Sequence, residues 1–305
     1  MRRRTIWHLA MALAIVPAST NGGQLFAQAA SPLSGPRLPE NALGRRTFDE
    51  DFVRFDAGAD QVPGPRRHRW RTVMGYGGPA AFDNRKLTGS SVAVDRDFPG
   101  VSQGRLGERP LGLDPFETQP GKPFAILARP IPPALQGQLW NARWYGGQIT
   151  TKFSFSQRYG YFEVEARLPV GKGMWPQLWL LPVGGSWPLS GEIDIVEGLG
   201  DPHVIYTTLH VGQPHRQEQR KVVLPFDVSA EFHRYGVLWD RQNITWYVDR
   251  HEVMKTPVPR ELNQPMFLLL GLGVGGSWGG YPDAGTAFPG RLAIRRVQVW
   301  ELSGS

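Results

Sequence analysis

The sequence has 305 residues, of which 41% are hydrophobic, 20% charged and 11% aromatic, with a net charge of +7 and no cysteine. Without cysteine the chain can form no disulfide, no thiolate metal site and no cysteine nucleophile. A chain of this length can bury a large core without covalent staples, so a small disulfide-rich fold is excluded.

Residues 1–29 are typical of a secretory signal peptide. Arginines at positions 2–4 precede a short apolar run from Leu9 to Val16, and Ala27-Gln28-Ala29 supplies an Ala-x-Ala cleavage site. The apolar run is shorter than the roughly 20 residues that cross a bilayer, so we expect no membrane span. The sequence therefore predicts export to the periplasm or the medium after cleavage near Ala29. The general and the twin-arginine routes both stay open.

Cleavage at this point removes three arginines and lowers the net charge from +7 to +4. A mild positive charge is consistent with solubility or, alternatively, with affinity for an acidic polymer. The basic stretch Pro63–Arg71 is interpreted as a solvated loop, because no nucleic-acid-binding module accompanies it. We expect no nucleic-acid partner and find no signal for a protein partner.

The next segment, residues 30–46, is rich in Pro, Ser and Gly and predicts a tether. Residues 47–305 then form one predicted domain of short β-type runs separated by turn residues. Residues Tyr161–Leu168 alternate, with Phe162, Val164 and Ala166 on one face. Further predicted strands are Gln148–Phe155, Val204–Val211, His233–Trp239, Ile244–Val248, Met266–Leu272 and Leu292–Trp300. This pattern predicts an all-β sandwich of two antiparallel sheets.

Three acids lie close together on one of these runs, Glu192-Ile193-Asp194-Ile195-Val196-Glu197. On a regular strand Glu192 and Asp194 share a face, whereas Glu197 would point into the core. One extra residue at a β-bulge near Ile195-Val196 would return Glu197 to the acidic face. We therefore expect three carboxyl groups in a row, with Ile193, Ile195 and Val196 buried.

A row of three acids suits glycosidic bond cleavage. The Cα atoms of Glu192 and Glu197 would lie about 13 Å apart on such a strand. Side chains leaning inward can then bring the carboxyl groups to the 5–5.5 Å separation that is typical of retaining glycosidases. Mutual repulsion raises at least one pKa, so that one acid can donate a proton while another stays ionised. The alternatives are an ordinary acidic, solvent-exposed strand face and a three-carboxylate metal site.

Three tryptophans precede the acidic strand: Trp175, Trp179 and Trp187. Indole rings stack on sugar faces, so an acidic strand beside tryptophans favours a glycan-binding cleft. The alternative for each ring is packing in the core, and for Trp179, in the run Gln-Leu-Trp-Leu-Leu-Pro, the two interpretations stay open.

Several segments in order resemble glycoside hydrolase family 16. They are Tyr159–Val164, Gly173–Pro182, Glu192–Glu197, Thr208–His210, Phe232–Tyr235, Trp246–Asp249 and Pro265–Asp283. The resemblance implies a β-jelly-roll sandwich of the concanavalin A type with a concave glycan cleft. It also implies that Glu192 is the nucleophile, Glu197 the general acid/base and Asp194 an electrostatic partner. By the same resemblance His210 and Trp278 would lie beside the substrate, although a strand histidine and a packed indole remain alternatives.

Two details refine the resemblance. Arg295-Arg296 stands where many members of the family carry an aspartate that helps to bind calcium, so we expect no metal and no other cofactor. The bulged acidic motif is similar to the branch that includes laminarinases, agarases and carrageenases. Residues Leu111–Phe116 also resemble bacterial exopolysaccharide depolymerases of the family, such as those acting on succinoglycan.

The sequence thus predicts an exported, retaining endo-β-glycanase acting on a β-linked polysaccharide. A transglycosylase on the same scaffold and a non-catalytic glycan-binding sandwich are the alternatives. Three stretches, Trp140–Gly147, Gly184–Ser190 and Gly212–Lys221, are predicted loops that would shape the substrate site. Within them Arg143, Arg216 and Arg220 would either meet acidic substituents of a substrate or be solvated.

Overall fold

The computed structural model describes residues 33–58, 68–72, 86–88 (backbone only) and 90–304. The predicted signal peptide and most of the basic stretch Pro63–Arg71 lie outside these residues. Within the described part the regular secondary structure is almost entirely β-strand, with one 3-10 turn at Glu40–Ala42 and one helical turn, α1, at Pro133–Gln136. No helix of the described residues is long and apolar enough to cross a membrane.

The larger of the two main sheets has eleven strands in the described residues. Its central order is β19 (His251–Pro257), β18 (Asn243–Val248), β17 (His233–Trp239), β12 (Gly160–Arg167), β21 (Gly290–Leu302), β9 (Phe124–Pro130), β10 (Trp144–Gly146), β5 (Ser91–Ala93) and β4 (Lys86–Thr88). In addition, β1 (Leu43–Glu50) pairs with β21, and β8 (Phe116–Glu117) pairs with β9.

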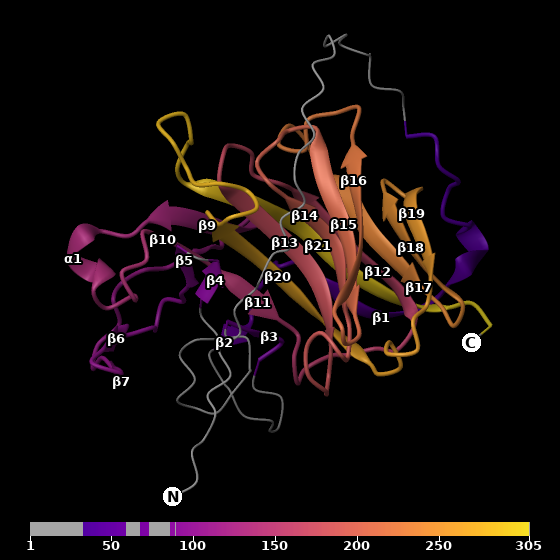
Figure 1. Ribbon diagram of the computed structural model, residues 1–305, viewed down its shortest axis with the longest axis horizontal. Coiled ribbons are helices and arrows are strands. Elements are labelled where there is room, and N and C mark those ends of the chain that lie inside the picture. The colour runs from indigo at the N-terminus through magenta and orange to yellow at the C-terminus, as the bar shows by residue number, and fades with distance from the viewer. Residues whose placement is uncertain (1–32, 59–67, 73–85, 89, 305) are drawn as a thin grey trace, which may run out of the picture.

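The second main sheet has eight described strands and carries the three acids near its middle. Its order is β16 (Arg216–Val223), β15 (Val204–Val211), β14 (Glu192–Gly198), β13 (Met174–Pro182), β20 (Met266–Val274), β11 (Gln148–Thr150), β3 (Trp70–Arg71) and β2 (Ala57–Gly58). Figure 1 shows β14 running between β13 and β15. Pairing is antiparallel except between β10 and β5 and between β2 and β3.

The main core fills the space between the two sheets, because successive side chains of a strand point to opposite faces and each sheet turns one apolar face inward. On β12 the side chains of Phe162, Val164 and Ala166 point into this core, as predicted. From the opposite sheet, Leu178 and Leu180 of β13 do the same. Each of the larger buried side chains stabilises the fold by about 1.5–3 kcal/mol. The predicted all-β sandwich is confirmed.

Most predicted strands are found, and three segments differ from the prediction. The predicted loop Trp140–Gly147 contains the short strand β10, which pairs with β9 and β5. The strand predicted over Gln148–Phe155 ends at Thr150, because the chain turns there: the Thr151 carbonyl accepts hydrogen bonds from the amides of Ser154 and Phe155. The predicted loop Gly212–Lys221 is strand from Arg216 onward, as β16 at the edge of the second sheet. Arg216 and Arg220 are therefore strand residues.

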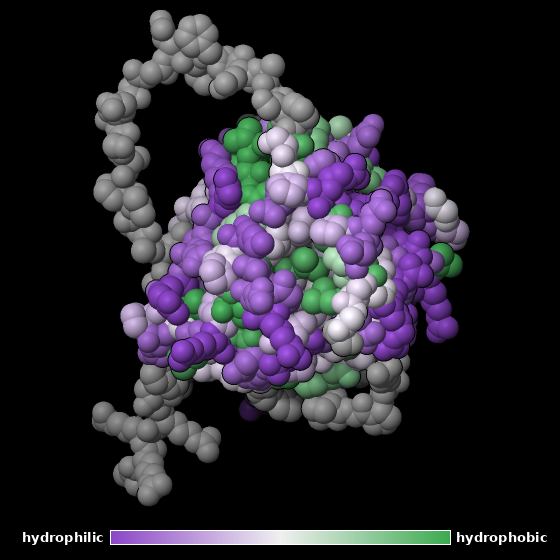
Figure 2. All heavy atoms as spheres, turned by 90° about the vertical axis from the view of Figure 1, so that its right-hand side faces the viewer, coloured by the Kyte–Doolittle hydropathy of each residue, from purple (hydrophilic) through white to green (hydrophobic). Residues whose placement is uncertain are grey.

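A smaller lobe extends from one end of the sandwich, where α1, β6 (Val101–Ser102) and β7 (Arg105–Leu106) lie (Figure 1). It has its own apolar cluster, which includes Val94, Phe98 and Leu139. The opposite end, with β18 and β19, presents a mainly hydrophilic surface with small separate hydrophobic patches (Figure 2).

The described part of the predicted tether, residues 33–46, lies against the larger sheet. Leu38 is buried in a cluster with Tyr161 and Tyr247, on the outer face of that sheet. From Leu43 onward the chain pairs with β21.

Candidate active site

A β-bulge on β14 sets the direction of the acidic side chains. On the β13 side, Leu178 pairs with Val196 and Trp179 pairs with Asp194, so that Ile195 is an extra residue on β14. The pairing with β15 shows a shift over the same residues. Classic bulges place two residues opposite one and bend the strand. The bulge predicted from the spacing of the acids is therefore present.

The bulge returns Glu197 to the face that carries Glu192 and Asp194. Ile193, Ile195 and Val196 belong to the main core, and the three acids point to the other face, away from that core. Asp194 is 3% and Glu197 8% exposed, while Glu192 is partly exposed. We call Glu192, Asp194 and Glu197 the acid cluster.

The opposite sheet holds the bulge in place. The indole Nε1 of Trp246, on β18, donates a hydrogen bond of 2.8 Å across the core to the backbone carbonyl of Asp194. A bulge leaves ladder groups without their usual partners, and a buried carbonyl without a donor is costly. Trp246 satisfies this carbonyl, so the position of the acid cluster depends on both sheets.

Burial raises the pKa of every member of the acid cluster. For Glu192, burial and then the charge of Asp194 raise the pKa well above its usual range. For Asp194, burial and then the charge of Glu197 do the same. Burial raises the pKa of Glu197 to about 7, although a hydrogen bond from Trp175 opposes it. At neutral pH the cluster therefore holds protons that isolated carboxyl groups would have lost.

The carboxyl groups of Glu192 and Asp194 influence each other's pKa. A hydrogen bond between their carboxyl groups raises the pKa of Glu192 and lowers that of Asp194. Interacting acids of this kind titrate as a pair rather than as separate groups.

Each glutamate of the cluster accepts a hydrogen bond from an indole. Trp175 Nε1 donates to Glu197 Oε1 over 2.9 Å, and Trp187 Nε1 donates to Glu192 Oε2. Both bonds favour the ionised carboxylate and lower its pKa. The sequence thus placed both tryptophans correctly beside the acids.

The ring of Trp175 does not offer the exposed stacking surface that we expected for a sugar. It is 4% exposed, because Trp278 covers it in an edge-on contact with 5.5 Å between ring centroids. Tyr206 of β15 contacts the other side of Trp278 at 4.9 Å. Trp278 and Tyr206 are themselves partly exposed and are the open aromatic surface beside Glu197.

The remaining predicted tryptophan, Trp179, faces the same side as the acids but is packed. It is 7% exposed in a small cluster with Leu181, Phe267 and Leu269, to which Trp187 adds its partly buried ring. Its edge reaches over Gly271, where an added Cβ would lie 3.5 Å from the indole.

His210, which the resemblance placed beside the substrate, lies next to the acid cluster. It pairs with Glu192 across β15 and β14, and its Nε2 lies 3.2 Å from Asp194 Oδ2. Its positive charge, when present, lowers the pKa of both Glu192 and Glu197. Its other ring nitrogen, Nδ1, is 2.9 Å from Nε2 of His215.

Two polar residues that we did not predict support Glu197. The side chain of Thr208, on β15, hydrogen-bonds to Glu197 and lowers its pKa. Gln219, on β16, donates to Thr208 Oγ1 over 3.1 Å. Strand alternation could have indicated Thr208 and Tyr206, since both share the face of His210.

The three arginines for which substrate contact and solvation both stayed open lie at exposed positions. Arg143 stacks on Trp144, 4.8 Å from the ring centroid, and Arg216 forms an ion pair with Glu261 at 3.2 Å. Arg220 is exposed on β16.

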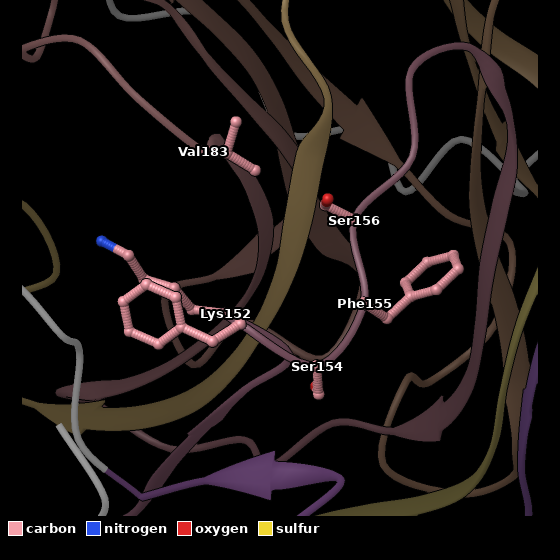
Figure 3. Close-up of a pocket in the computed structure, with 6 residues that line it drawn as sticks. Lys152, Ser154, Phe155, Ser156 and Val183 are labelled. Atoms are coloured by element: carbon pink, nitrogen blue, oxygen red, sulfur yellow. The ribbon is translucent and has the colours of Figure 1, made fainter. Parts of the chain in front are cut away.

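A shallow pocket of about 300 Å³ lies away from the acid cluster, where the chain turns after β11. Its lining residues are Lys152–Ser156 and Val183, and Figure 3 shows the Lys152 amine and the Phe155 ring on opposite sides of this segment. No carboxyl group lines the pocket, so the acid cluster remains the candidate active site.

The calcium position expected for the family does not fit this chain. Arg296, on β21, donates two hydrogen bonds of 2.8 Å to the carboxylate of Asp49, on β1, and holds its pKa below the usual range. A guanidinium thus already neutralises that carboxylate. Among the described residues no group of three or more His, Asp or Glu side chains is placed to hold a metal ion.

Comparison with known proteins agrees with this geometry. The profile of the family described as "Glycosyl hydrolases family 16" matches residues 133–287, slightly more than half of the chain. The chain belongs to glycosyl hydrolases family 16. The matched region includes the bulged strand β14, and the described strands adjacent to it in the sheet, β13 and β15.

Among curated proteins, the endo-1,3-1,4-beta-glycanase ExsH of Rhizobium meliloti is 34% identical over 196 residues, which are 64% of this chain and 41% of that protein. A beta-glucanase of Rhodothermus marinus is 34% identical over 175 residues, or 50% of this chain and 61% of that protein. The chain thus spans about two fifths of the length of ExsH.

Among solved structures, the laminarinase catalytic domain of Thermotoga maritima superposes with a TM-score of 0.65 at 27% identity, over 84% of this chain and 98% of that one. This family 16 neighbour confirms the jelly-roll fold predicted from the sequence.

Proposed function

We propose that this family 16 protein is a retaining endo-β-glucanase that hydrolyses β-1,3- or mixed β-1,3-1,4-linked glucans. The observation that carries the proposal is the row of three carboxyl groups on one bulged strand, two of them buried, with the pKa of Glu197 raised to about 7. This pKa allows Glu197 to donate a proton near neutrality and to accept one afterwards.

The reaction would run in two displacement steps. Glu197 protonates the glycosidic oxygen while the Glu192 carboxylate attacks the anomeric carbon, which forms a covalent glycosyl-enzyme. Glu192 must be ionised for this attack, and the Trp187 N–H stabilises its carboxylate. Glu197 then removes a proton from water, which releases the sugar with retained configuration.

The names of the relatives support the proposed substrate class. ExsH and EglC of Rhizobium meliloti are both named endo-1,3-1,4-beta-glycanases, and each is 34% identical to this chain. The Rhodothermus marinus relative is named a beta-glucanase. A bacterial exopolysaccharide with β-linked glucose is the further substrate that the Leu111–Phe116 resemblance supports.

The decisive experiment measures new reducing ends from laminarin, mixed-linkage glucan, agarose, carrageenan and a succinylated exopolysaccharide. We expect the wild type to cleave at least one of the two glucans and Glu192→Gln to lose at least about 10³-fold in kcat, because the nucleophile is gone. Equal release by both proteins would remove Glu192 from the mechanism. ¹H NMR of the first product should show the β-anomer, and an initial α-anomer would exclude retention.

A non-catalytic glucan-binding protein is the second candidate. A relative from Penaeus monodon, 29% identical over 178 residues, is named a beta-1,3-glucan-binding protein. Laminarin binding by the wild type without any release of reducing ends would favour this candidate. Transfer to a labelled oligosaccharide acceptor would instead indicate a transglycosylase. Export, which we propose from residues 1–29, is tested by the N-terminal sequence of the protein recovered outside the cytoplasm.

A further inference from the structure

His215, on the turn that precedes β16, contacts His210, which in turn lies beside the acid cluster. Its Nε2 is 2.9 Å from Nδ1 of His210, and the two rings are nearly coplanar, with 19° between their planes. Its ring also contacts Trp187, with 5.1 Å between centroids. His215 therefore touches both the residue that faces Asp194 and the residue that donates to Glu192.

We propose that His215 is a positioning residue for the acid cluster, because it holds His210 with Nε2 directed at Asp194. The proposal concerns the geometry of His210, and its kinetic part rests on the proposed glucanase activity.

Because an imidazole can donate or accept a hydrogen bond, His215 can bind His210 whether His210 is neutral or protonated. A neutral His210 with its proton on Nε2 offers Nδ1 as an acceptor, to which the His215 N–H donates. A protonated His210 donates from Nδ1, and a neutral His215 accepts. In both states the bond between the two rings can form, so that the ring plane of His210 stays fixed with Nε2 at 3.2 Å from Asp194 Oδ2.

The charges around the pair favour this arrangement. From β14, the carboxyl groups of Asp194, Glu192 and Glu197 all interact with His210. Burial and then the charge of His210 lower the pKa of His215, which keeps His215 the neutral partner.

On the side of the turn, the charged neighbour Arg216 is bound to Glu261 at 3.2 Å. No other ionisable group is described in contact with the two rings.

The proposal predicts how activity depends on pH. A positive His210 lowers the pKa of Glu192 and Glu197. A hydrogen bond to a charged form stabilises that form, so an acceptor at position 215 favours positive His210. Loss of the acceptor then raises the pKa of the acid cluster and moves the ascending limb of kcat/KM to higher pH.

Two amide substitutions separate positioning from a general structural role. The terminal amide of glutamine reaches the place of histidine Nε2 and can donate or accept, whereas the amide of asparagine is too short. We expect His215→Gln to behave like the wild type. We expect His215→Asn to lose about three- to tenfold in kcat with KM unchanged, which is the range for one lost orienting hydrogen bond. Its ascending limb of kcat/KM should lie at higher pH than that of the wild type.

The matched control is His203→Asn, at the opposite end of β15. His203 is likewise exposed and hydrogen-bonded through Nδ1, to the Phe226 carbonyl at 2.9 Å. This variant should keep the wild-type kcat and pH profile.

A second readout does not depend on activity. ¹⁵N NMR of histidine-labelled protein reports which ring nitrogen of His210 carries the proton, with the His210→Asn variant for assignment. We expect one His210 tautomer, protonated at Nε2, in the wild type and His215→Gln, and a mixture in His215→Asn.

Identical His210 signals in all three proteins would overturn the proposal. A raised KM with unchanged kcat in His215→Asn would also overturn it and make His215 a substrate contact. Failure of the wild type to cleave any glucan would refute the proposed function alone, since the NMR result still decides the role of His215.

Discussion

Replacement of Trp175 by Phe isolates the hydrogen bond that tunes Glu197. Trp175 Nε1 lies 2.9 Å from Glu197 Oε1 and lowers the pKa of that carboxyl, against the larger effect of burial. A hydrogen bond to a charged group contributes about 1.5–3 kcal/mol. Because one pKa unit corresponds to about 1.4 kcal/mol, loss of this bond should raise the pKa of Glu197 by about one unit or more.

The assay is kcat/KM on laminarin, measured across the neutral and alkaline range. Glu197 must be protonated to release the leaving group, so its higher pKa moves the descending limb to higher pH in Trp175→Phe. Trp179→Phe is the matched control, since Trp179 lies on the same strand and face but packs in the apolar cluster. A descending limb that stays in place, or moves to lower pH, would refute the assignment of Glu197 as the proton donor.

Three further predictions concern stability. Trp246→Phe leaves the buried Asp194 carbonyl without its donor. We therefore expect the free energy of unfolding in urea to fall by about 1–3 kcal/mol, together with a lower kcat. An unchanged kcat would show that the bulge does not need this bond. Glu197 has its pKa raised from 4.5 to about 7 in the fold, so the unfolded chain releases this proton first and stability falls as pH rises between these values. Glu197→Gln should therefore match the wild type near pH 4 and exceed it near pH 8 by up to about 3 kcal/mol in calorimetry, and a less stable variant near pH 8 would contradict the shift. Chelation with EDTA should leave the Tm unchanged, and a Tm that falls on chelation would show that a metal binds. Arg296→Ala should lower the free energy of unfolding by about 0.5–1 kcal/mol, because its two hydrogen bonds to Asp49 are lost.

Local patterns were sufficient to predict the strands that bury one face. The segments Val204–Val211 and His233–Trp239 coincide with β15 and β17. The bulge was predictable as well, because Glu197 could join the other acids only if one residue was extra. In both cases the alternation of side chains carries the information.

Other parts of the structure leave no local signal. The first six residues of the strand β16 are all exposed, so it shows no alternation that would separate it from a loop. The bond from Trp246 to Asp194 joins positions 52 apart, in different sheets. The cover of Trp175 likewise comes from Trp278, far along the chain. Such contacts depend on how the sheets pack, which no short segment determines.

The pairing of each glutamate with its own indole gives the protein a built-in optical probe. Indole emission responds to the ionisation of a carboxyl group that it touches, and Trp175 and Trp187 touch different members of the acid cluster. The difference between the fluorescence titrations of the wild type and a single Trp→Phe variant would report the ionisation of one glutamate at a time. Proton movements in this site can thus be observed in solution without a substrate and without a label.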